Sequence, residues 1–147
     1  MCGICGLRLF QGSKPELDQI RSMLDRLERR GPDHEGSFSD GPLAMGHRRL
    51  SILDLSFHSN QPMVDQELGL ALVFNGTIYN HPQLRRELEG LGHRFMSTGD
   101  TEVILKAYAQ WGERCVERLT GMFAFGIWEM KTQRLMLARD RLGIKPL

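Results

Sequence analysis

The residue best suited to covalent chemistry stands at the start of the chain, where Cys2 follows Met1. Removal of Met1 would give Cys2 a free α-amine beside its own thiol. An α-amino group has a pKa of about 8, far below that of lysine, so it is partly neutral at physiological pH. The amine could therefore serve as general base for the thiol, directly or through one water. Position alone leaves a second interpretation open, a small buried cysteine at the start of a strand.

Cys2 and Cys5 also form a Cys-x-x-Cys pair, a spacing found in redox and zinc sites. A redox pair of this kind begins a helix, whereas this one lies in a strand-like segment. A zinc site needs two further ligands, and Cys115 and the five histidines show no paired metal spacing. We therefore predict no metal site in the chain and expect Cys5 and Cys115 to be small buried residues.

Composition sets modest limits on the class of protein. The 147 residues suit one domain, and 41% hydrophobic and 25% charged residues are ordinary for a globular chain. The net charge of +1 gives no sign of a nucleic-acid or membrane surface. No apolar run approaches the length of a membrane span, and no secretion signal is evident. An odd number of cysteines fits the reducing cytoplasm, where we expect the protein to reside.

Apolar periodicity predicts an α+β chain with several antiparallel strands. One helix carries a stripe of Leu17, Ile20, Leu24 and Leu27 and ends at Arg29 and Arg30. Further helices are expected at 83–91, 101–111 and 113–119, and strands at 2–10, 36–39, 43–49, 70–75, 122–130 and 135–139. The run 70–75 stops at Asn75-Gly76, a pair that alone most often means a hairpin turn.

Seven segments, in order, resemble the glutamine amidotransferase domain of the asparagine synthetase family, and together they span essentially the whole chain. They are RGPDHEG (30–36), HRRLSILDLS (47–56), QPM (61–63), FNGTIYN (74–80), GDTEVIL (99–105), GMFAFGIW (121–128) and ARDRLGIKPL (138–147).

The resemblance implies an N-terminal-nucleophile hydrolase fold, a four-layer αββα sandwich of two antiparallel sheets between helices. It also implies hydrolysis of glutamine to glutamate and ammonia, the half-reaction that supplies ammonia to a glutamine-hydrolysing asparagine synthase in asparagine biosynthesis. In full-length members, a second domain activates a carboxylate with ATP.

The resemblance assigns roles to matching residues. Cys2 falls on the nucleophile, and Asn75 and Gly76 fall on the oxyanion hole, with the amide side chain of Asn75 and the backbone N–H of Gly76 as donors. Arg49 matches the arginine that grips the α-carboxylate of glutamine, a task that suits a guanidinium. Asp100 matches the acid that contacts the α-ammonium group, although a helix N-cap is the alternative there.

Thr77 is the main departure from the family pattern. Most members carry glutamate at this substrate-binding position, where it helps to meet the amine of glutamine. Threonine has no charge and a shorter reach, so either Asp100 alone supplies the charge or glutamine binds more weakly. Relatives that amidate an acylated glutamine dipeptide also lack this glutamate, and we expect that branch as the alternative parent enzyme.

Other motif residues are expected to be structural. RGPDHEG would form a loop over the site, held by a local ion pair or hydrogen bonds of Arg30 and Asp33. Asp140 and Arg141 are also interpreted as structural, and Arg48 as a solvated strand residue. The apolar stripe Met122, Phe123, Phe125, Ile127 and Trp128 is interpreted as core rather than as a cofactor site.

The chain stops at Leu147, and we expect residues 1–147 to be an incomplete amidotransferase type 2 domain without the synthetase domain. No cofactor is expected in this chain, and ATP and Mg²⁺ are expected only for the synthetase domain. Expected partners are glutamine and that domain of the same polypeptide, with no nucleic acid and no membrane; a homodimer stays open. A non-catalytic fragment is the remaining alternative, because family domains continue with further sheet residues and loss of those strands could abolish activity. An unpaired sheet edge would also be an aggregation hazard.

Overall fold

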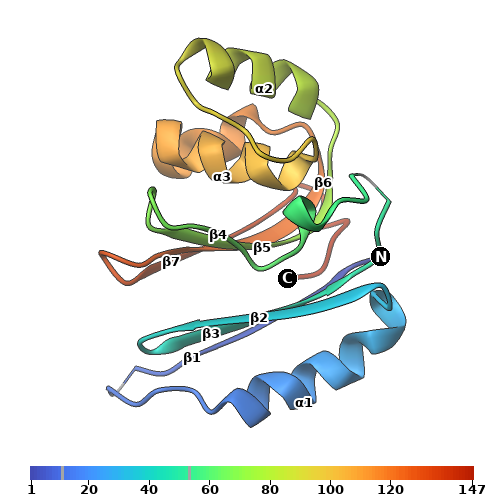
Figure 1. Cartoon of the computed structure of the whole chain (residues 1–147), viewed down its shortest axis with the longest axis vertical. Helices are drawn as coiled ribbons and strands as arrows, with labels where there is room; N and C mark the ends of the chain where they lie inside the picture. The colour runs from blue at the N-terminus through green and yellow to red at the C-terminus, as the bar shows by residue number, and fades with distance from the viewer. Residues whose placement is uncertain (11, 53) are drawn as a thin grey trace.

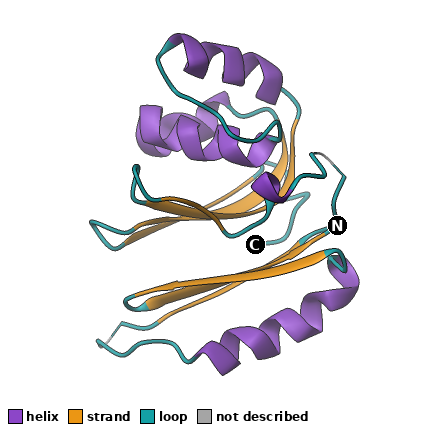
Figure 2. Cartoon of the chain, in the orientation of Figure 1, coloured by secondary structure: helices purple, strands orange, loops and turns teal. Residues whose placement is uncertain are grey.

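The computed structural model of the chain contains two antiparallel sheets that pack face to face between helices (Figure 1). The structure describes residues 1–10, 12–52 and 54–147; Gln11, and Leu53 within the motif 47–56, lie outside this description. One helix covers the outer face of the first sheet, and two helices cover the outer face of the second (Figures 1 and 2). This order of layers confirms the αββα sandwich that the resemblance implies.

The helices and strands follow one another along the chain as follows. They are β1 (Gly3–Arg8), α1 (Leu17–Leu27), η1 (Glu28–Arg30), β2 (His34–Asp40), β3 (Leu43–Arg49), η2 (Phe57–Ser59), β4 (Met63–Asp65), β5 (Leu70–Ile78), α2 (His81–Gly90), α3 (Asp100–Trp111), η3 (Gly112–Arg118), β6 (Gly121–Glu129) and β7 (Arg134–Arg139), the η elements being 3₁₀ helices.

Each sheet is antiparallel throughout its described strands. The first has the order β1-β3-β2, and the second has the order β4-β5-β6-β7. Ile4 of β1 lies opposite His47 of β3, and Asn75 of β5 lies opposite Ala124 of β6. The N-terminal end of β1 and the middle of β5 thus belong to different sheets, and the face-to-face packing brings them together.

Helix α1 packs its buried residues Ile20 and Leu24 against Ala44 of β3. A capping box between Glu16 and Gln19 starts the helix. Leu17, which we predicted on the buried stripe, is 63% exposed because it occupies the first turn, at the edge of the contact with the sheet.

Strand β6 divides its apolar side chains between two cores because successive side chains point to opposite faces. Phe123, Phe125 and Ile127 pack with the helices α2 and α3, whereas Trp128 packs between the sheets. The indole Nε1 of Trp128 also donates to Asp40 of β2 at 2.7 Å and so ties one sheet to the other. These four residues of the predicted stripe are core, as expected, but they serve both faces, whereas Met122 is only half-buried and belongs to neither core.

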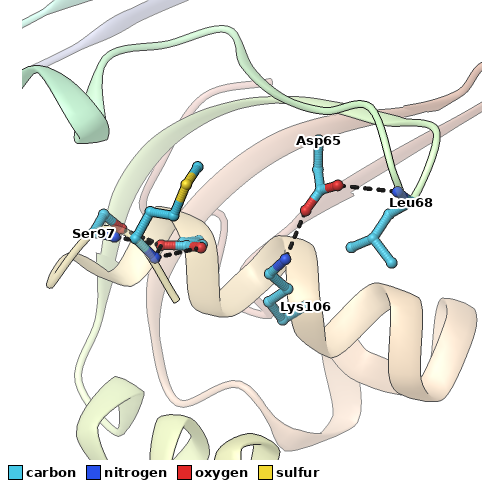
Figure 3. A network of polar contacts seen from close by, with 6 residues as sticks. Asp65, Leu68, Ser97 and Lys106 are labelled. Atoms are coloured by element: carbon cyan, nitrogen blue, oxygen red, sulfur yellow. Dashed lines mark hydrogen bonds and ion pairs between the residues drawn. The ribbon is translucent and has the colours of Figure 1, made fainter. Parts of the chain in front are cut away.

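Helix α3 is anchored at its start and along its length by buried polar contacts (Figure 3). Near its first turn, the Glu102 carboxylate accepts the backbone N–H of Ser97 at 2.7 Å. Further along, Lys106 pairs with Asp65 at 2.6 Å, and the same carboxylate accepts the N–H of Leu68. These contacts fix the segment before α3, which carries one wall of the site described below.

Three sequence predictions differ from the structure. Strand β5 continues past Asn75-Gly76 to Ile78, because pairing with β6 extends the strand through the turn-prone pair. The expected third helix, 113–119, is the 3₁₀ helix η3. The segment RGPDHEG is a loop only in its first half, since β2 already begins at His34. Strand β4 was not predicted, because three residues are too short to show a period.

Candidate active site

A polar pocket of about 140 Å³ lies where the two sheets meet near the start of the chain. It receives residues from the segment just before β1, from the end of β3, from β5 and from the first turn of α3. All six residues predicted for the site line it, namely Cys2, Arg49, Asn75, Gly76, Thr77 and Asp100. The fold therefore gathers in one small cavity side chains that lie up to ninety-eight positions apart, from Cys2 to Asp100.

Cys2 lies one residue before β1, with its backbone and its thiol both held in place. Arg30 donates through Nε to the Cys2 carbonyl at 3.1 Å. The backbone N–H of Leu50 donates to the Cys2 Sγ at 3.4 Å, and the thiol contacts the Leu50 carbonyl at 3.7 Å. Met1 also lines the pocket, and its Sδ lies 3.1 Å from Lys145 Nζ. Loss of Met1 would thus open the pocket beside the thiol and expose the α-amine there.

The two cysteines of the Cys-x-x-Cys pair serve different faces of the first sheet. Ile4, which shares a strand face with Cys2, packs between the sheets, whereas Cys5 packs on the opposite face with α1. Burial raises the pKa of the Cys5 thiol. Burial also raises the pKa of Cys115 to about 12. A dithiol made of Cys2 and Cys5 is inconsistent with this alternation.

Asn75 and Gly76 face the pocket from the middle of β5. Asn75 shares its strand face with Ala71 and Val73, which pack between the sheets, so its buried side chain points toward the first sheet. A Cβ atom at Gly76 would lie 2.2 Å from the Met122 carbonyl oxygen, so only glycine permits the close approach to β6.

The backbone of Gly76 is turned away from β6. Opposite Gly76, the N–H and C=O of Phe123 bond to Asp140 instead of to β5. In an antiparallel ladder, this makes Gly76 and Phe123 a non-hydrogen-bonded pair. The Gly76 N–H therefore points to the other edge of β5, which opens into the pocket. An oxyanion formed in the pocket would meet this donor.

Arg49 reaches the pocket from the end of β3 and also holds the segment 54–60. Its guanidinium donates to the Ser56 carbonyl at 3.0 Å and to the Asn60 side-chain oxygen at 2.6 Å, and it also bonds the Asp54 carbonyl. Arg49 is buried and lines the same cavity as Cys2. It therefore joins a wall of the pocket to the loop that follows β3.

Asp54 ties this loop to the start of α3. One oxygen of its carboxylate accepts the N–H of Thr98 at 2.6 Å and of Gly99 at 3.2 Å, and the other accepts the N–H of Ser56. Partial burial alone would raise the pKa of Asp54, but the Ser56 hydroxyl and these N–H groups outweigh it and hold the pKa well below its usual range. The sequence analysis gave Asp54 no role.

Asp100 is the first residue of α3, and its buried carboxylate points across to β5. It accepts the N–H of Ile78 at 2.9 Å. Burial raises the pKa of Asp100, although the Ile78 N–H and the nearby His81 oppose this shift. The N-cap is Gly99, so the N-cap alternative for Asp100 is wrong by one residue. A cationic ligand in the pocket would offset the cost of keeping this carboxylate ionised. Thr77 contributes no charge beside it.

Arg30 and Asp33 hold the chain by hydrogen bonds, one of the two kinds of contact that we predicted for them, whereas Arg48 differs from the prediction. Arg30 bonds the Cys2 carbonyl rather than Asp33, whose carboxylate accepts the N–H of Ser51 at 2.7 Å. Arg48 is not a solvated residue. It bonds the Leu24 carbonyl at the end of α1 and pairs with Glu35 at 2.5 Å.

Asp140 is structural, as expected. It accepts backbone N–H groups of Phe123, Ile144 and Lys145 and so folds the end of the chain back toward the pocket. Desolvation acts to raise the pKa of this carboxyl, but the N–H groups outweigh it and lower the pKa.

Two further buried polar residues belong to this region, Gln61 in the lining of the pocket and His47 behind Phe74. Both lie in sequence motifs, but no role was predicted for either. The His47 ring contacts the Phe74 carbonyl, and Gln61 accepts the Phe74 N–H. The sequence did carry one indication of the role of His47. His47 shares a strand face with the apolar Leu43 and Met45, so its polar ring was expected to be buried and to need a hydrogen-bond partner.

A second, larger cavity of about 430 Å³ lies between the sheets and borders the first at Cys2 and Asn75. Its lining is mainly apolar, with Ile4, Met45 and Val73 among its walls. The smaller pocket contains both Arg49 and Asp100, which the larger cavity does not, so the smaller pocket is the candidate site for a polar substrate.

The described ranges 1–10, 12–52 and 54–147 show no sign of two other classes of site. They contain no group of three or more histidine, cysteine or acidic residues arranged to hold a metal ion. Within the same ranges, no helix has the length and apolarity needed to cross a membrane.

A cysteine that directly follows Met1, at the junction of two facing antiparallel sheets and in one pocket with Gly76, fits the arrangement of an N-terminal-nucleophile hydrolase. The comparisons with known proteins narrow this class. The glutamine amidotransferase domain family matches residues 1–147. The chain belongs to that family.

Relatives and solved structures agree with this assignment. The chain is 41% identical over 152 residues to asparagine synthetase [glutamine-hydrolyzing] 3 of Bacillus subtilis, covering 99% of this chain and 24% of that protein. It is 35% identical to amidase chyE of Penicillium rubens, covering 100% of this chain and 23% of that protein. The chain therefore spans about a quarter of the length of the curated relatives that it matches.

Among solved structures, the fold resembles the glutamine phosphoribosylpyrophosphate amidotransferase of B. subtilis. The TM-score is 0.61 and the sequence identity is 29%, with 74% of this chain and 25% of that chain covered. This structural similarity agrees with the family assignment and with the observed αββα sandwich.

Proposed function

We propose that this chain hydrolyses glutamine to glutamate and ammonia, with Cys2 as nucleophile after removal of Met1. The observation that carries the proposal is the single pocket that contains the Cys2 thiol, the Gly76 N–H edge and the charged Arg49 and Asp100. Family membership supports the same reaction.

In the proposed reaction, the α-amine takes the thiol proton, and the sulfur forms a bond to the carbonyl carbon of the glutamine side-chain amide. The carbonyl oxygen takes up the negative charge, which Asn75 and Gly76 stabilise; one such donor is typically worth about 3 kcal/mol. The C–N bond then breaks, and nitrogen leaves as ammonia with the proton from the amine. Water attacks the resulting thioester, returns a proton to the amine, and releases glutamate and free thiol.

The roles of the other residues follow from charge. Arg49 would hold the α-carboxylate of glutamine, and Asp100 would hold the α-ammonium group with Thr77 beside it. Burial raises the pKa of Asp100, which means that its ionised form is costly in the empty pocket. The positive charge of a bound ammonium group would neutralise this carboxylate, and binding would therefore be favoured.

The relatives support a wider proposal for the full-length protein. Glutamine-hydrolysing asparagine synthetases are about four times as long as this chain, and we propose that the ammonia passes to a synthetase domain that uses ATP and Mg²⁺. Amidation of an acylated glutamine dipeptide is the second candidate, because Thr77 stands where most members carry glutamate. A cytoplasmic location and a homodimer stay predictions.

The test replaces Cys2 with alanine in correctly processed protein. We expect Cys2→Ala to abolish glutamate release and to leave glutamine affinity within about threefold, because the substrate's charged groups are held by other residues. Calorimetry would measure the affinity and a coupled assay the turnover. Glutamine hydrolysis by the alanine variant would contradict the proposal, and Cys2→Ser, which keeps a weaker nucleophile, is the matched control.

A further inference from the structure

Strand β5 loses its neighbour on one side just before it reaches the pocket. The short strand β4 pairs with β5 only as far as Leu72, which lies opposite Met63. The N–H and C=O groups of the following even-numbered residues, Phe74, Gly76 and Ile78, face that same edge, because these residues form the non-hydrogen-bonded pairs with β6. Buried groups of this kind need other partners.

Side chains from elsewhere in the fold bond the edge on both sides of Gly76. Before it, the Phe74 N–H donates to Gln61 Oε1 at 2.6 Å, and the Phe74 carbonyl lies 3.1 Å from His47 Nε2. After it, the Ile78 N–H donates to Asp100 at 2.9 Å. The Gly76 peptide thus lies between two positions whose backbone is held by buried side chains, while its own N–H faces the pocket.

Gln61 is itself held at both ends. Its Nε2 lies 3.4 Å from the Thr101 hydroxyl in the first turn of α3. Its backbone passes so close to β2 that a Cβ at Gly36 would lie 2.1 Å from the Gln61 carbonyl oxygen. A side chain fixed in this way can impose a position on the Phe74 N–H.

His47, which lies in the opposite sheet, holds the carbonyl group of Phe74. A carbonyl only accepts, so the bond to Phe74 requires the proton on Nε2. His47 is fully buried, and no hydrogen-bond partner for its Nδ1 occurs in the part of the chain that the structure describes. The ring is therefore held in one tautomer by the Phe74 carbonyl.

We infer that His47 and Gln61 are positioning residues for the oxyanion hole. They clamp the backbone at Phe74 so that the side chain of Asn75 and the N–H of Gly76 face the tetrahedral intermediate. The inference rests on the proposed function, since it concerns the same pocket. Removal of the clamp should weaken stabilisation of the transition state more than binding of glutamine, because neither residue is among those assigned to the charged groups of the substrate.

The experiment compares His47→Met with His47→Gln in processed protein. The two replacements have similar size, but only glutamine keeps an N–H donor near the Nε2 position. We expect His47→Met to lower kcat about 10- to 100-fold, less than the loss of an oxyanion donor itself, with KM changed less than about threefold. His47→Gln should recover most of the loss. Gln61→Met provides the second variant, with a loss of kcat in the same direction.

A transition-state analogue supplies a readout that a merely structural role would leave unchanged. The aldehyde analogue of glutamine, in which CHO replaces the side-chain amide, adds the Cys2 thiol to form a tetrahedral hemithioacetal. We expect the folded His47→Met and Gln61→Met proteins to bind it more weakly by the same factor as kcat falls, with glutamine affinity nearly unchanged.

Two results would overturn the inference. One is unchanged kcat and unchanged aldehyde affinity in folded His47→Met and Gln61→Met, and the other is an equal loss in His47→Gln and His47→Met. Measurements on the parent protein distinguish failure of this inference from failure of the proposed function. If the processed parent neither hydrolyses glutamine nor binds the aldehyde, the proposed function fails; if it does both and the variants match it, only the clamp fails.

Discussion

At the scale of single residues, the site depends on which side chains can carry charge close to the thiol. Arg49 and Asp100 are both buried in the lining of the pocket, and each is fixed by backbone contacts. Such preorganisation favours a ligand with one carboxylate and one ammonium group, as in a free amino acid. Thr77 lies on the same strand face as Asn75 and offers only a hydroxyl.

Replacement of Thr77 by glutamate tests this account of charge. We expect Thr77→Glu to lower the KM for glutamine about three- to tenfold, because a second carboxylate would meet the α-ammonium group beside Asp100. Steady-state kinetics would measure the change. Thr77→Gln is the neutral control of the same size, and it should show no such gain. Equal effects of both variants would mean that Thr77 does not face the amine.

At the scale of elements, the site is assembled by segments that bridge between strands and helices. Asp54 joins the segment 54–60 to the residues before α3, and Arg49 joins the same segment to β3. Both walls of the pocket therefore depend on one loop. Removal of the Asp54 carboxylate would leave the N–H groups of Thr98 and Gly99 without their acceptor.

We expect Asp54→Ala to raise the KM for glutamine and to speed hydrogen exchange at Thr98 and Gly99 by about tenfold or more, because the loop would detach from α3. Hydrogen exchange followed by NMR would resolve these two amides. Asp25, an exposed acid on α1, provides the control as Asp25→Ala. Slow exchange at both amides in Asp54→Ala would show that other contacts hold the loop.

At the scale of the whole molecule, few polar contacts join the two sheets across an apolar interior. His47 of β3 reaches Phe74 of β5, and Trp128 of β6 reaches Asp40 of β2. Burial lowers the pKa of His47 to about 4, with the Phe74 carbonyl opposing and the nearby Arg49 and His34 adding to this shift. Charging this ring would place an unpaired cation between the sheets.

The stability of the fold should therefore depend on pH through His47. Its folded-state pKa lies below the value of about 6.5 in the unfolded chain, so the unfolded state binds more protons between pH 6.5 and 4. We expect the contribution of His47 to the free energy of unfolding to be complete above pH 6.5. The free energy of unfolding should then fall by up to about 3 kcal/mol as the pH drops to 4. Urea unfolding of parent and His47→Gln should show this fall only in the parent. A parallel fall in both would assign it to other groups.

Apolar periodicity predicted many of the helices and strands, whereas the resemblance to the amidotransferase family predicted the layered fold and the polar residues of the site. The positions of Cys2, Asn75, Gly76 and Asp100 in one pocket follow from motifs that keep their order along the chain. The extent of β5 did not follow, because the local preference of Asn75-Gly76 for a turn yields to pairing with β6.

The clamp at Phe74 and the loop contact of Asp54 could not be predicted from local pattern. Each joins residues distant in sequence, such as His47 with Phe74 and Asp54 with Thr98, and only the packing of the two sheets defines those pairs. Strand β4 escaped prediction for a different reason, since Met63–Asp65 exists as a strand only because β5 lies beside it.

The most direct test of the central claim is glutamate release by two forms of the same chain, one that begins at Cys2 and one that retains Met1. Intact mass would confirm the first residue of each. We predict that folded protein beginning at Cys2 hydrolyses glutamine. We predict that the Met1 form is inactive, because its Cys2 nitrogen is part of a peptide bond and because the methionine stays in the pocket. Equal turnover by both forms, or no turnover by the folded Cys2 form, would contradict an N-terminal nucleophile.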